Sequence, residues 1–221
     1  MIRAAILTAT ELLLFAGCLF GAAGRLSWPM AWAALGFYAA CKVAAFAILD
    51  PDLLRERAAP GPGVDRGDVV LATVGWLALY PAMFVAAGLD AGRFGPAVAI
   101  PQVVRVAAFL VYALGTGFAF WAVHANRFFS TFVRIQEDRG HTVVSSGPYA
   151  VVRHPGYAGV LLAHLALAFA LGSVWALLPV AVGTIFFVAR TSREDRTLRD
   201  HLAGYREYQT RVRWRLVPGV W

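Results

Sequence analysis

Hydrophobic and polar stretches alternate along this chain on the length scale of a membrane bilayer. Four apolar runs have about the 20 residues that a spanning helix requires, and they cover residues 4–23, 28–49, 69–88 and 102–124. Two shorter apolar runs, 157–171 and 174–189, are joined by Gly172-Ser173, and we expect them to form a thin or partly re-entrant helical hairpin. The pattern predicts an all-α, polytopic integral membrane protein with about five to six transmembrane helices.

The polar connections between these runs predict shorter helices. In the 50–67 loop, Asp52–Arg57 is spaced for one amphipathic turn, and Pro60-Gly61-Pro62-Gly63 then blocks regular structure. The connection 125–156 begins with residues that recur at helical spacing and present an aromatic face, which predicts a short interfacial helix; they are Phe128, Phe129, Phe132, Val133 and Gln136.

A C-terminal helix is expected beyond the last apolar run. Its i, i+3 and i+4 spacings place one set of side chains on a single face, namely Arg190, Glu194, Leu198, Leu202 and Tyr205. Asp195 and Arg199 are spaced as a separate pair on the same helix, which we interpret as solvated.

The composition excludes an ordinary soluble domain. Of 221 residues, 59% are apolar and 15% are charged, whereas soluble domains average roughly 45–50% apolar and about 25% charged. Mean hydropathy is +0.62. The formal charge of +7 comes almost entirely from arginine, with eight arginines between Arg190 and Arg215. No nucleic-acid recognition motif accompanies them, so we expect membrane lipids and no nucleic acid as partners.

Arginine placement also predicts an orientation. The 50–67 loop, the 125–156 loop and the tail carry most of the arginines, so we expect them to face the cytoplasm from the inner cell membrane. Glu11 and Lys42 interrupt apolar runs, where charge is costly. They can pair with one another, and in a transporter or channel they would mark an ion path. The sequence has no metal-ligand spacing, so no metal is expected.

Residues 141–157 are dense in polar side chains, glycine and proline, although they lie between two apolar regions. Gly147-Pro148 and Pro155-Gly156 are turn signals, which hold His154 on non-helical backbone. Irregular backbone beside membrane spans is tolerated where it lines a cavity. The segment is therefore either the wall of a ligand pocket or an ordinary loop with a basic anchor.

Two charged residues at the start of the C-terminal helix can complete such a pocket. Glu194 follows Arg190 by one turn, roughly 6 Å along the axis. The predicted hairpin returns this helix start to the neighbourhood of His154. The alternative is an ion pair within the helix that is worth a few tenths of a kcal/mol.

These segments resemble the isoprenylcysteine carboxyl methyltransferase family, part of a wider group of membrane methyltransferases that includes the phospholipid N-methyltransferases. The resemblance covers about residues 125–218 and lies in HTVV, SSGPY, VVRHPGYAG, Arg190 with Glu194-Asp195, YREYQTRV and RLVPG. The family's acidic pair is usually Glu-Glu, and its tail motif is one residue longer than Leu202 to Tyr205 here.

The resemblance implies S-adenosylmethionine as the cofactor that donates the methyl group, and a lipophilic or prenylated acceptor from the bilayer. Arg190 falls where the family holds the acceptor's carboxylate, which arginine can grip with two parallel N–H bonds. The implied donor contacts are Gln136, His141, Thr142, Val143, Val144, Tyr149, His154, Pro155, Gly156, Tyr157 and Glu194. We expect residues 1–124 to form transmembrane helices and 125–221 a methyltransferase core with a cytoplasmic cofactor-binding loop, in one integrated domain.

The favoured function is carboxyl O-methylation of a membrane-embedded, lipid-like acceptor. Two enzymatic alternatives stay open. One is a phospholipid amine N-methyltransferase. The other is an NADPH-dependent sterol-type membrane reductase, which resembles this family in its carboxy-terminal half, including an RHP-x-Y run.

Overall fold

The apolar runs are helices in the computed structural model, which describes residues 2–221. The first long helix joins α1 (Ile2–Ala16) to the π-helical turn η1 (Gly17–Gly21). The second is α2 (Pro29–Ile48), and the fourth is α6 (Gln102–Ala125). The third is one continuous helix built from α4 (Arg66–Leu77), η2 (Ala78–Ala82), α5 (Met83–Ala87) and η3 (Gly88–Phe94). These four are long and apolar enough to cross a membrane, which confirms an all-α polytopic membrane protein.

The third helix is longer than its apolar run because both ends are held by acidic side chains. Asp65 caps its start by accepting hydrogen bonds from the backbone N–H groups of Gly67 and Asp68. Near its end, buried Asp90 accepts a 2.6 Å hydrogen bond from the Ser173 hydroxyl. Pro81, inside this helix, lies in the π-helical segment η2, where the ladder adapts to the missing N–H group.

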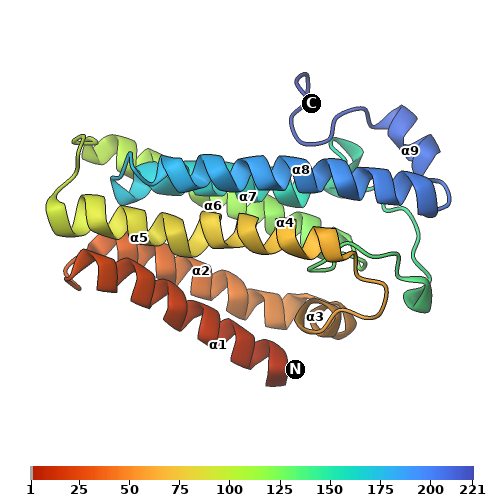
Figure 1. Ribbon diagram of the computed structural model, residues 1–221, viewed down its shortest axis with the longest axis horizontal. Coiled ribbons are helices and arrows are strands. Elements are labelled where there is room, and N and C mark those ends of the chain that lie inside the picture. Colours follow the sequence, from red (N-terminus) through yellow and green to blue (C-terminus); the bar gives the residue numbers. More distant parts are fainter. Residues whose placement is uncertain (1) are drawn as a thin grey trace.

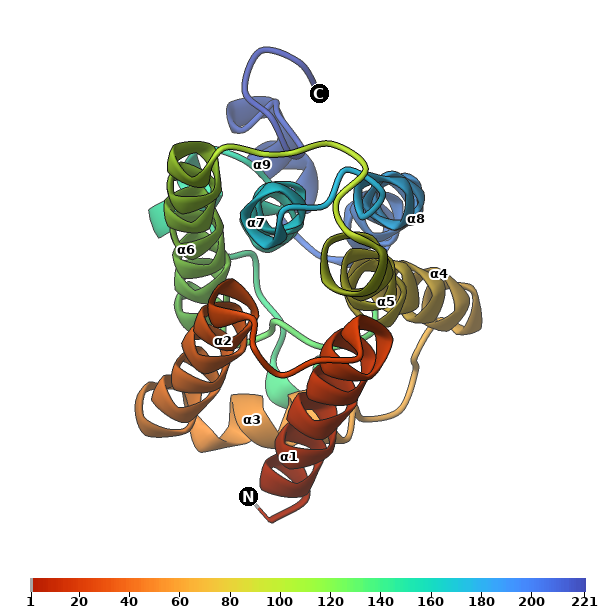
Figure 2. The ribbon, with the colours of Figure 1, turned by 90° about the vertical axis from the view of Figure 1, so that its left-hand side faces the viewer.

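The predicted hairpin forms from α7 (Pro155–Leu171) and α8 (Leu177–His201), with Gly172 closing α7 in a left-handed conformation. Helix α7 lies between α6 and α8 when the bundle is viewed end-on (Figure 2). It packs closely on α6 because a Cβ at Gly159 would lie 2.6 Å from the carbonyl oxygen of Gly115. The close approach explains why much of α7 is buried although it has only 17 residues.

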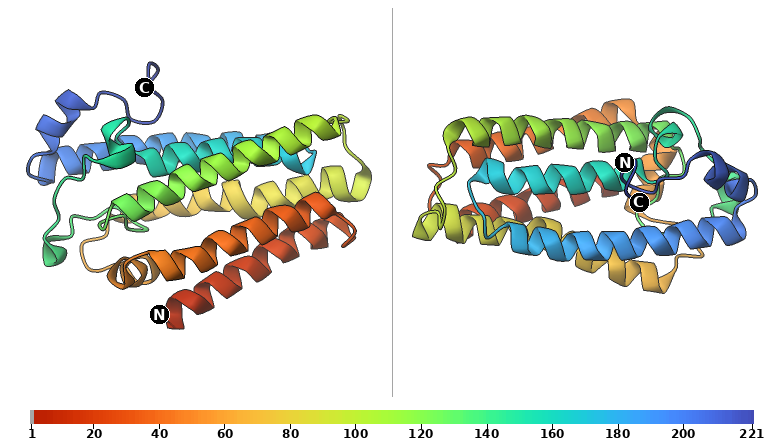
Figure 3. Two further views of the ribbon diagram at one scale, coloured as in Figure 1. Left: turned by 180° about the vertical axis from the view of Figure 1, so that it is seen from behind. Right: turned by 90° about the horizontal axis from the view of Figure 1, so that it is seen from above.

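Polar elements gather at one end of the bundle. Helix α3 (Pro51–Ala58), the 126–154 connection and α9 (Tyr205–Arg211) lie at the same end as the N-terminus (Figure 1). The connection contains two short 3-10 turns, η4 (Glu137–Arg139) and η5 (Gly147–Ala150). Figure 3 shows the same arrangement from behind and from above, with α8 extending past the other helices toward α9.

Two local predictions were wrong. Residues 127–136 form no helix within the described chain, because their backbone groups bond instead to the side chains of Asp68 and Arg190 and to the backbone N–H of Asp65. Helix α8 ends at His201, and Gly204 in a left-handed conformation turns the chain, so Tyr205 begins α9 rather than continuing the α8 face. The pairing of Glu11 with Lys42 is confirmed, with the carboxylate and ammonium 2.7 Å apart.

Candidate active site

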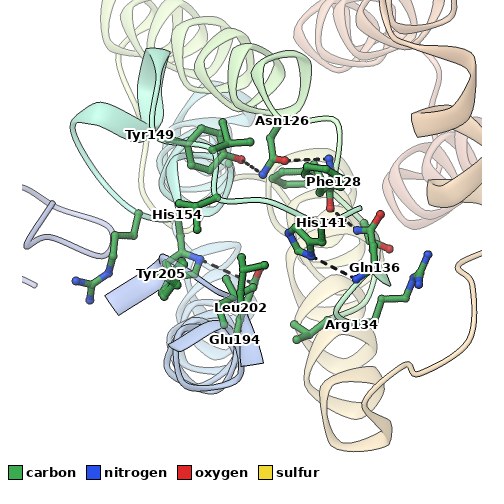
Figure 4. A pocket seen from close by; sticks show the side chains of 18 of the residues that line it. Asn126, Phe128, Arg134, Gln136, His141, Tyr149, His154, Glu194, Leu202 and Tyr205 are labelled. Atoms are coloured by element: carbon green, nitrogen blue, oxygen red, sulfur yellow. Dashed lines mark hydrogen bonds and ion pairs between the residues drawn. The ribbon is translucent and has the colours of Figure 1, made fainter. Parts of the chain in front are cut away.

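A cavity lies at the polar end of the bundle, between the 126–157 segment and α8. It encloses about 740 Å³ of space not filled by protein, part of it open to solvent. Figure 4 shows His141, Gln136 and Phe128 on one side, and His154, Tyr205, Leu202 and Glu194 on the other.

The first wall is extended chain held by tertiary hydrogen bonds. The N–H group of Val133 donates to the carboxylate of Asp68 at 2.7 Å, and the carbonyl of Thr131 accepts from Arg190 at 2.7 Å. Farther along, the side-chain amide of Gln136 donates to the carbonyl of Phe128 at 2.6 Å. In this extended conformation the side chains of Phe128, Phe129 and Phe132 line the cavity and do not form one face of a helix.

A buried arginine fastens this wall to α3. Arg134 is 4% exposed and forms two 2.8 Å hydrogen bonds to the carboxylate of Glu56, as well as an ion pair to Asp138 at 2.8 Å. The hydrogen bonds from Arg134 hold the pKa of both carboxyl groups below their usual range. The wall is thereby fixed in position without regular secondary structure.

His141 faces the cavity as a neutral imidazole. Its Nδ1 accepts a 3.3 Å hydrogen bond from the backbone N–H of Gln136, so the ring proton is on Nε2. Burial, and then the charges of Arg134 and Arg139, lower the pKa of His141 to about 4. The ring lies 4.6 Å from that of Phe128, and together they form a flat wall.

The second wall carries an accessible carboxylate. Glu194 accepts a hydrogen bond from the Tyr157 hydroxyl at 2.5 Å, and its carboxylate lies 3.9 Å from Nδ1 of His154. The side chain of Glu194 is 24% exposed, so the carboxylate can still meet a cationic ligand. His154 occupies the N-cap position of α7, but its ring stacks on Tyr157 instead of capping that helix.

Its neighbour Asp195 is buried at the centre of a network, so the expected solvated pair with Arg199 was wrong. Asp195 is 2% exposed and accepts hydrogen bonds from the Tyr205 hydroxyl at 2.9 Å and from Arg215 at 3.0 Å. Arg153 forms a 2.9 Å ion pair with it. Burial alone would raise the pKa of Asp195, but hydrogen bonding to His154 and Arg215 outweighs it and holds the pKa well below its usual range.

Arg190 lies in the cavity wall, but much of its guanidinium is already bound. Its Nε and Nη2 donate to the two oxygens of Asp68 at 2.8 and 3.1 Å, and Nη2 also donates to Thr131. The guanidinium lies over the ring of Tyr157, 5.1 Å from its centre. The fork predicted to grip an acceptor is therefore occupied by a protein carboxylate, and Nη1 is the nitrogen left for a ligand.

The cavity gathers eleven of the twelve predicted site residues. Among the described lining residues Pro155 is missing, because it is buried as the first residue of α7. Gln136 lines the cavity, yet its amide oxygen accepts from Arg139 and its nitrogen donates to Phe128, so it positions the wall. The sequence analysis missed further lining residues, which come from the connection between α6 and α7, from α8 and from the chain that follows α8: Asn126, Ser130, Arg134, Arg153, Leu198, Leu202 and Tyr208.

A family model of the phospholipid methyltransferases matches residues 103–203, from the start of α6 to the turn after α8. Residues 103–203 are a phospholipid methyltransferase domain. This family is the one that the resemblance named as a relative of the isoprenylcysteine carboxyl methyltransferases. No curated protein matches the chain significantly.

The methyltransferase domain contains most of the cavity, and the long apolar helices place it in a membrane. The protein is thus a membrane methyltransferase. Two further lining residues, Tyr205 and Tyr208, follow the matched segment, and the supporting carboxylates of Glu56 and Asp68 come from helices that precede it.

Proposed function

We propose that this protein transfers a methyl group from S-adenosylmethionine to a carboxylate of a lipid-like acceptor at the cytoplasmic face of the inner cell membrane. The observation that carries the proposal is the convergence of eleven predicted residues on one cavity with aromatic walls and an accessible carboxylate. S-adenosylmethionine supplies a methyl group activated on a sulfonium. The chain's own residues bind and orient the donor and the acceptor, and they exclude water from the cavity.

Glu194 is the residue expected to hold the donor. Its carboxylate is anionic and partly exposed, which suits an ammonium group or ribose hydroxyls. The rings of Tyr149, Tyr157 and His141 offer flat surfaces for a planar base. The hydroxyl of Tyr149 accepts from Asn126 at 3.2 Å, which leaves its own proton free to donate to a ligand.

A carboxylate acceptor does not require a general base from the protein. With a reference pKa near 4, it is already ionised at neutral pH. The site must then supply alignment of the two reactants and a dry, charge-matched cavity. We expect Nη1 of Arg190, the nitrogen not bound to Asp68 or Thr131, to donate to one acceptor oxygen.

The family match favours a second candidate, N-methylation of a phospholipid amine. Such an amine must first lose a proton, because an ammonium nitrogen has no lone pair with which to attack the methyl group. A reductase is less well supported, because arginines lining the cavity are paired with Glu56, Asp195 and Asp68 and are thus not free for the 2′-phosphate of NADPH.

Calorimetry with S-adenosylhomocysteine in detergent tests the donor assignment. We expect wild-type protein to bind it and Glu194→Gln to weaken binding about tenfold or more, since the change removes a charge-assisted contact. Glu207→Gln, on the exposed face of α9, is the matched control and should bind like wild type. Absence of binding to folded wild-type protein would reject the proposal.

Identification of the product then separates the two acceptors. Membranes are incubated with labelled methyl donor, and the labelled lipids are treated with mild base. A carboxyl methyl ester releases its label as methanol, whereas an N-methylated phospholipid keeps it.

A further inference from the structure

Arg57, at the end of α3, differs from the other arginines around the cavity. Arg134, Arg153 and Arg190 each have a carboxylate partner within 3 Å. Among residues 2–221, no carboxylate lies within ion-pair distance of Arg57. Its one side-chain hydrogen bond is a long one, 3.4 Å to the carbonyl of Phe129, and its guanidinium lies 5.2 Å from the centre of that ring.

The surroundings of Arg57 are protein rather than bulk water. The residue is half-buried, and burial is the largest influence on its guanidinium, lowering the pKa. Glu11 and the hydroxyl groups of Tyr38 and Tyr157 are near enough to oppose that shift electrostatically. A cation withdrawn from water without a partner is costly, so such a position favours binding of an anion.

Arg57 lies one aromatic layer behind the proposed donor site. Phe129, over which its guanidinium lies, is also a lining residue of the cavity, and its ring contacts Tyr157 at a centroid distance of 6.5 Å. The hydroxyl of Tyr157 in turn donates to Glu194. The end of α3 is held in place here, because the Thr131 hydroxyl donates to the carbonyl of Arg57 at 2.8 Å.

The side chains beyond Arg57 suit a lipid tail. Tyr38, Trp76 and Tyr80 come from α2 and the third helix, and all three are half-buried. They pack around Phe15, with ring centroids 5.0 to 5.8 Å from it. An amphiphile with its head at Arg57 would therefore place its apolar part among aromatic rings inside the bundle.

We propose that Arg57 binds the anionic group of the membrane acceptor, a carboxylate or a lipid phosphate. The inference rests on the proposed function, because it names the acceptor side of the same site. It also explains how the acceptor can be bound although Arg190 cannot grip it with two N–H bonds, because Nε and Nη2 of Arg190 already donate to Asp68. Arg57 supplies a positive charge that is not paired with a protein carboxylate. Arg190 supplies Nη1 as a hydrogen-bond donor and keeps the ring of Tyr157 in its orientation.

Direct lipid binding without any methyl donor tests this assignment. Two probe pairs are used in detergent: a prenylated cysteine with a free carboxylate against its methyl ester, and phosphatidic acid against diacylglycerol. We expect wild type to bind one anionic probe about tenfold or more tightly than its neutral partner, and Arg57→Gln to abolish that preference. The pair that shows the preference tells carboxylate from phosphate.

Arg55→Gln is the matched control, because Arg55 lies on the same helix but is exposed and pairs with Asp52. It should keep the wild-type preference. Binding of S-adenosylhomocysteine should change less than about twofold in Arg57→Gln, since the contacts of Arg57 are with Phe129 and Thr131 and not with Glu194. If wild type fails to bind S-adenosylhomocysteine, the proposed function fails while the lipid comparison still reports on Arg57.

Two outcomes would overturn the inference: equal binding of charged and neutral probes by wild type, or an unchanged preference in Arg57→Gln. If the glutamine variant does not fold, Arg57→Lys is measured instead. Lysine keeps the charge but loses the planar fork, so the preference should drop several-fold. A preference equal to that of wild type in Arg57→Lys would then count against the assignment.

Discussion

The two sides of the cavity are held by charge networks of different origin. The network around Asp195 joins Arg153, His154, Tyr205 and Arg215, all within the last third of the chain. The network of the opposite side joins Glu56 and Asp68, from α3 and α4, to arginines more than 70 residues later. One side is thus built from nearby sequence and the other from across the fold.

This difference coincides with the extent of the methyltransferase domain. Glu194 and Asp195 lie inside residues 103–203, whereas Arg57 and Asp68 precede them. The proposed donor side therefore depends mostly on the matched segment. The proposed acceptor side is completed by amino-terminal helices. We expect acceptor choice to be altered by changes in α3 and α4 that leave donor binding intact.

Removing the charge of Asp195 should have the largest effect on the molecule. Asp195→Asn leaves buried Arg153 without its ion-pair partner and weakens the contacts of Arg215 and His154. Breaking a buried pair from one side costs about 3–5 kcal/mol. We expect a loss of that size in unfolding free energy in detergent, together with loss of S-adenosylhomocysteine binding.

Asp200→Asn is the control for this change. Asp200 lies five residues later on α8 and pairs with Arg199 at the surface, where both side chains are at least 40% exposed. Exposed pairs contribute about 0–1 kcal/mol. Similar stability losses in the two variants would show that the Asp195 network does not hold the donor side.

Asp68→Asn should have a smaller effect, confined to the acceptor side. The amide still offers one oxygen, so the expected stability loss lies at the low end for a buried pair, about 3 kcal/mol. Freed from Asp68, Arg190 loses its fixed orientation over Tyr157. Acceptor kcat/KM should fall about tenfold or more, while S-adenosylhomocysteine affinity changes less than about threefold.

The same two helices provide a matched control one turn away. Asp65 and Arg193 form a 2.6 Å ion pair between α4 and α8, but the arginine is 46% exposed. Asp65→Asn should therefore cost about 0–1 kcal/mol and leave acceptor kinetics unchanged. If Asp68→Asn weakens donor binding as much as acceptor turnover, the separation of the two sides is wrong.

Much of the fold could be predicted from the sequence because the membrane constrains it strongly. Runs of about 20 apolar residues can only be helices where lipid offers backbone groups no partners. The predictions failed where tertiary contacts, and not a regular helix, satisfy the backbone hydrogen-bonding groups. Phe128 to Gln136 had helical spacing, but Asp68 and Arg190 offered their backbone better partners than a helix would.

The site could be predicted only where its residues are close in sequence. The segment from His141 to Tyr157 and the pair Arg190 and Glu194 carry recognisable motifs, and the structure brings them together. Asp68 and Arg57 carry no such motif, because each is an ordinary charged residue at a helix end. Their proposed roles depend on contacts with residues 65 or more positions away, which no local pattern reveals.

The smallest expected effect concerns His141 and its dependence on pH. An unfolded histidine has a pKa near 6.5, whereas that of His141 in the fold is lowered to about 4. Between these values the unfolded chain binds a proton that the folded protein does not. Stability is therefore complete above about pH 6.5 and falls progressively as the pH drops toward 4.

Thermal unfolding in detergent at pH 7.5 and pH 5 measures this dependence. His141→Gln should flatten the difference between the two pH values, because glutamine has no proton to gain. His201→Gln, at the exposed end of α8, should retain the wild-type difference. Because the ring of His141 is one of the flat surfaces proposed to hold the donor, S-adenosylhomocysteine affinity should fall over the same pH range in wild type and in Arg57→Gln alike. A fall in only one of them would mean that Arg57 and His141 act on the same ligand, and that the two sides of the cavity are not separate.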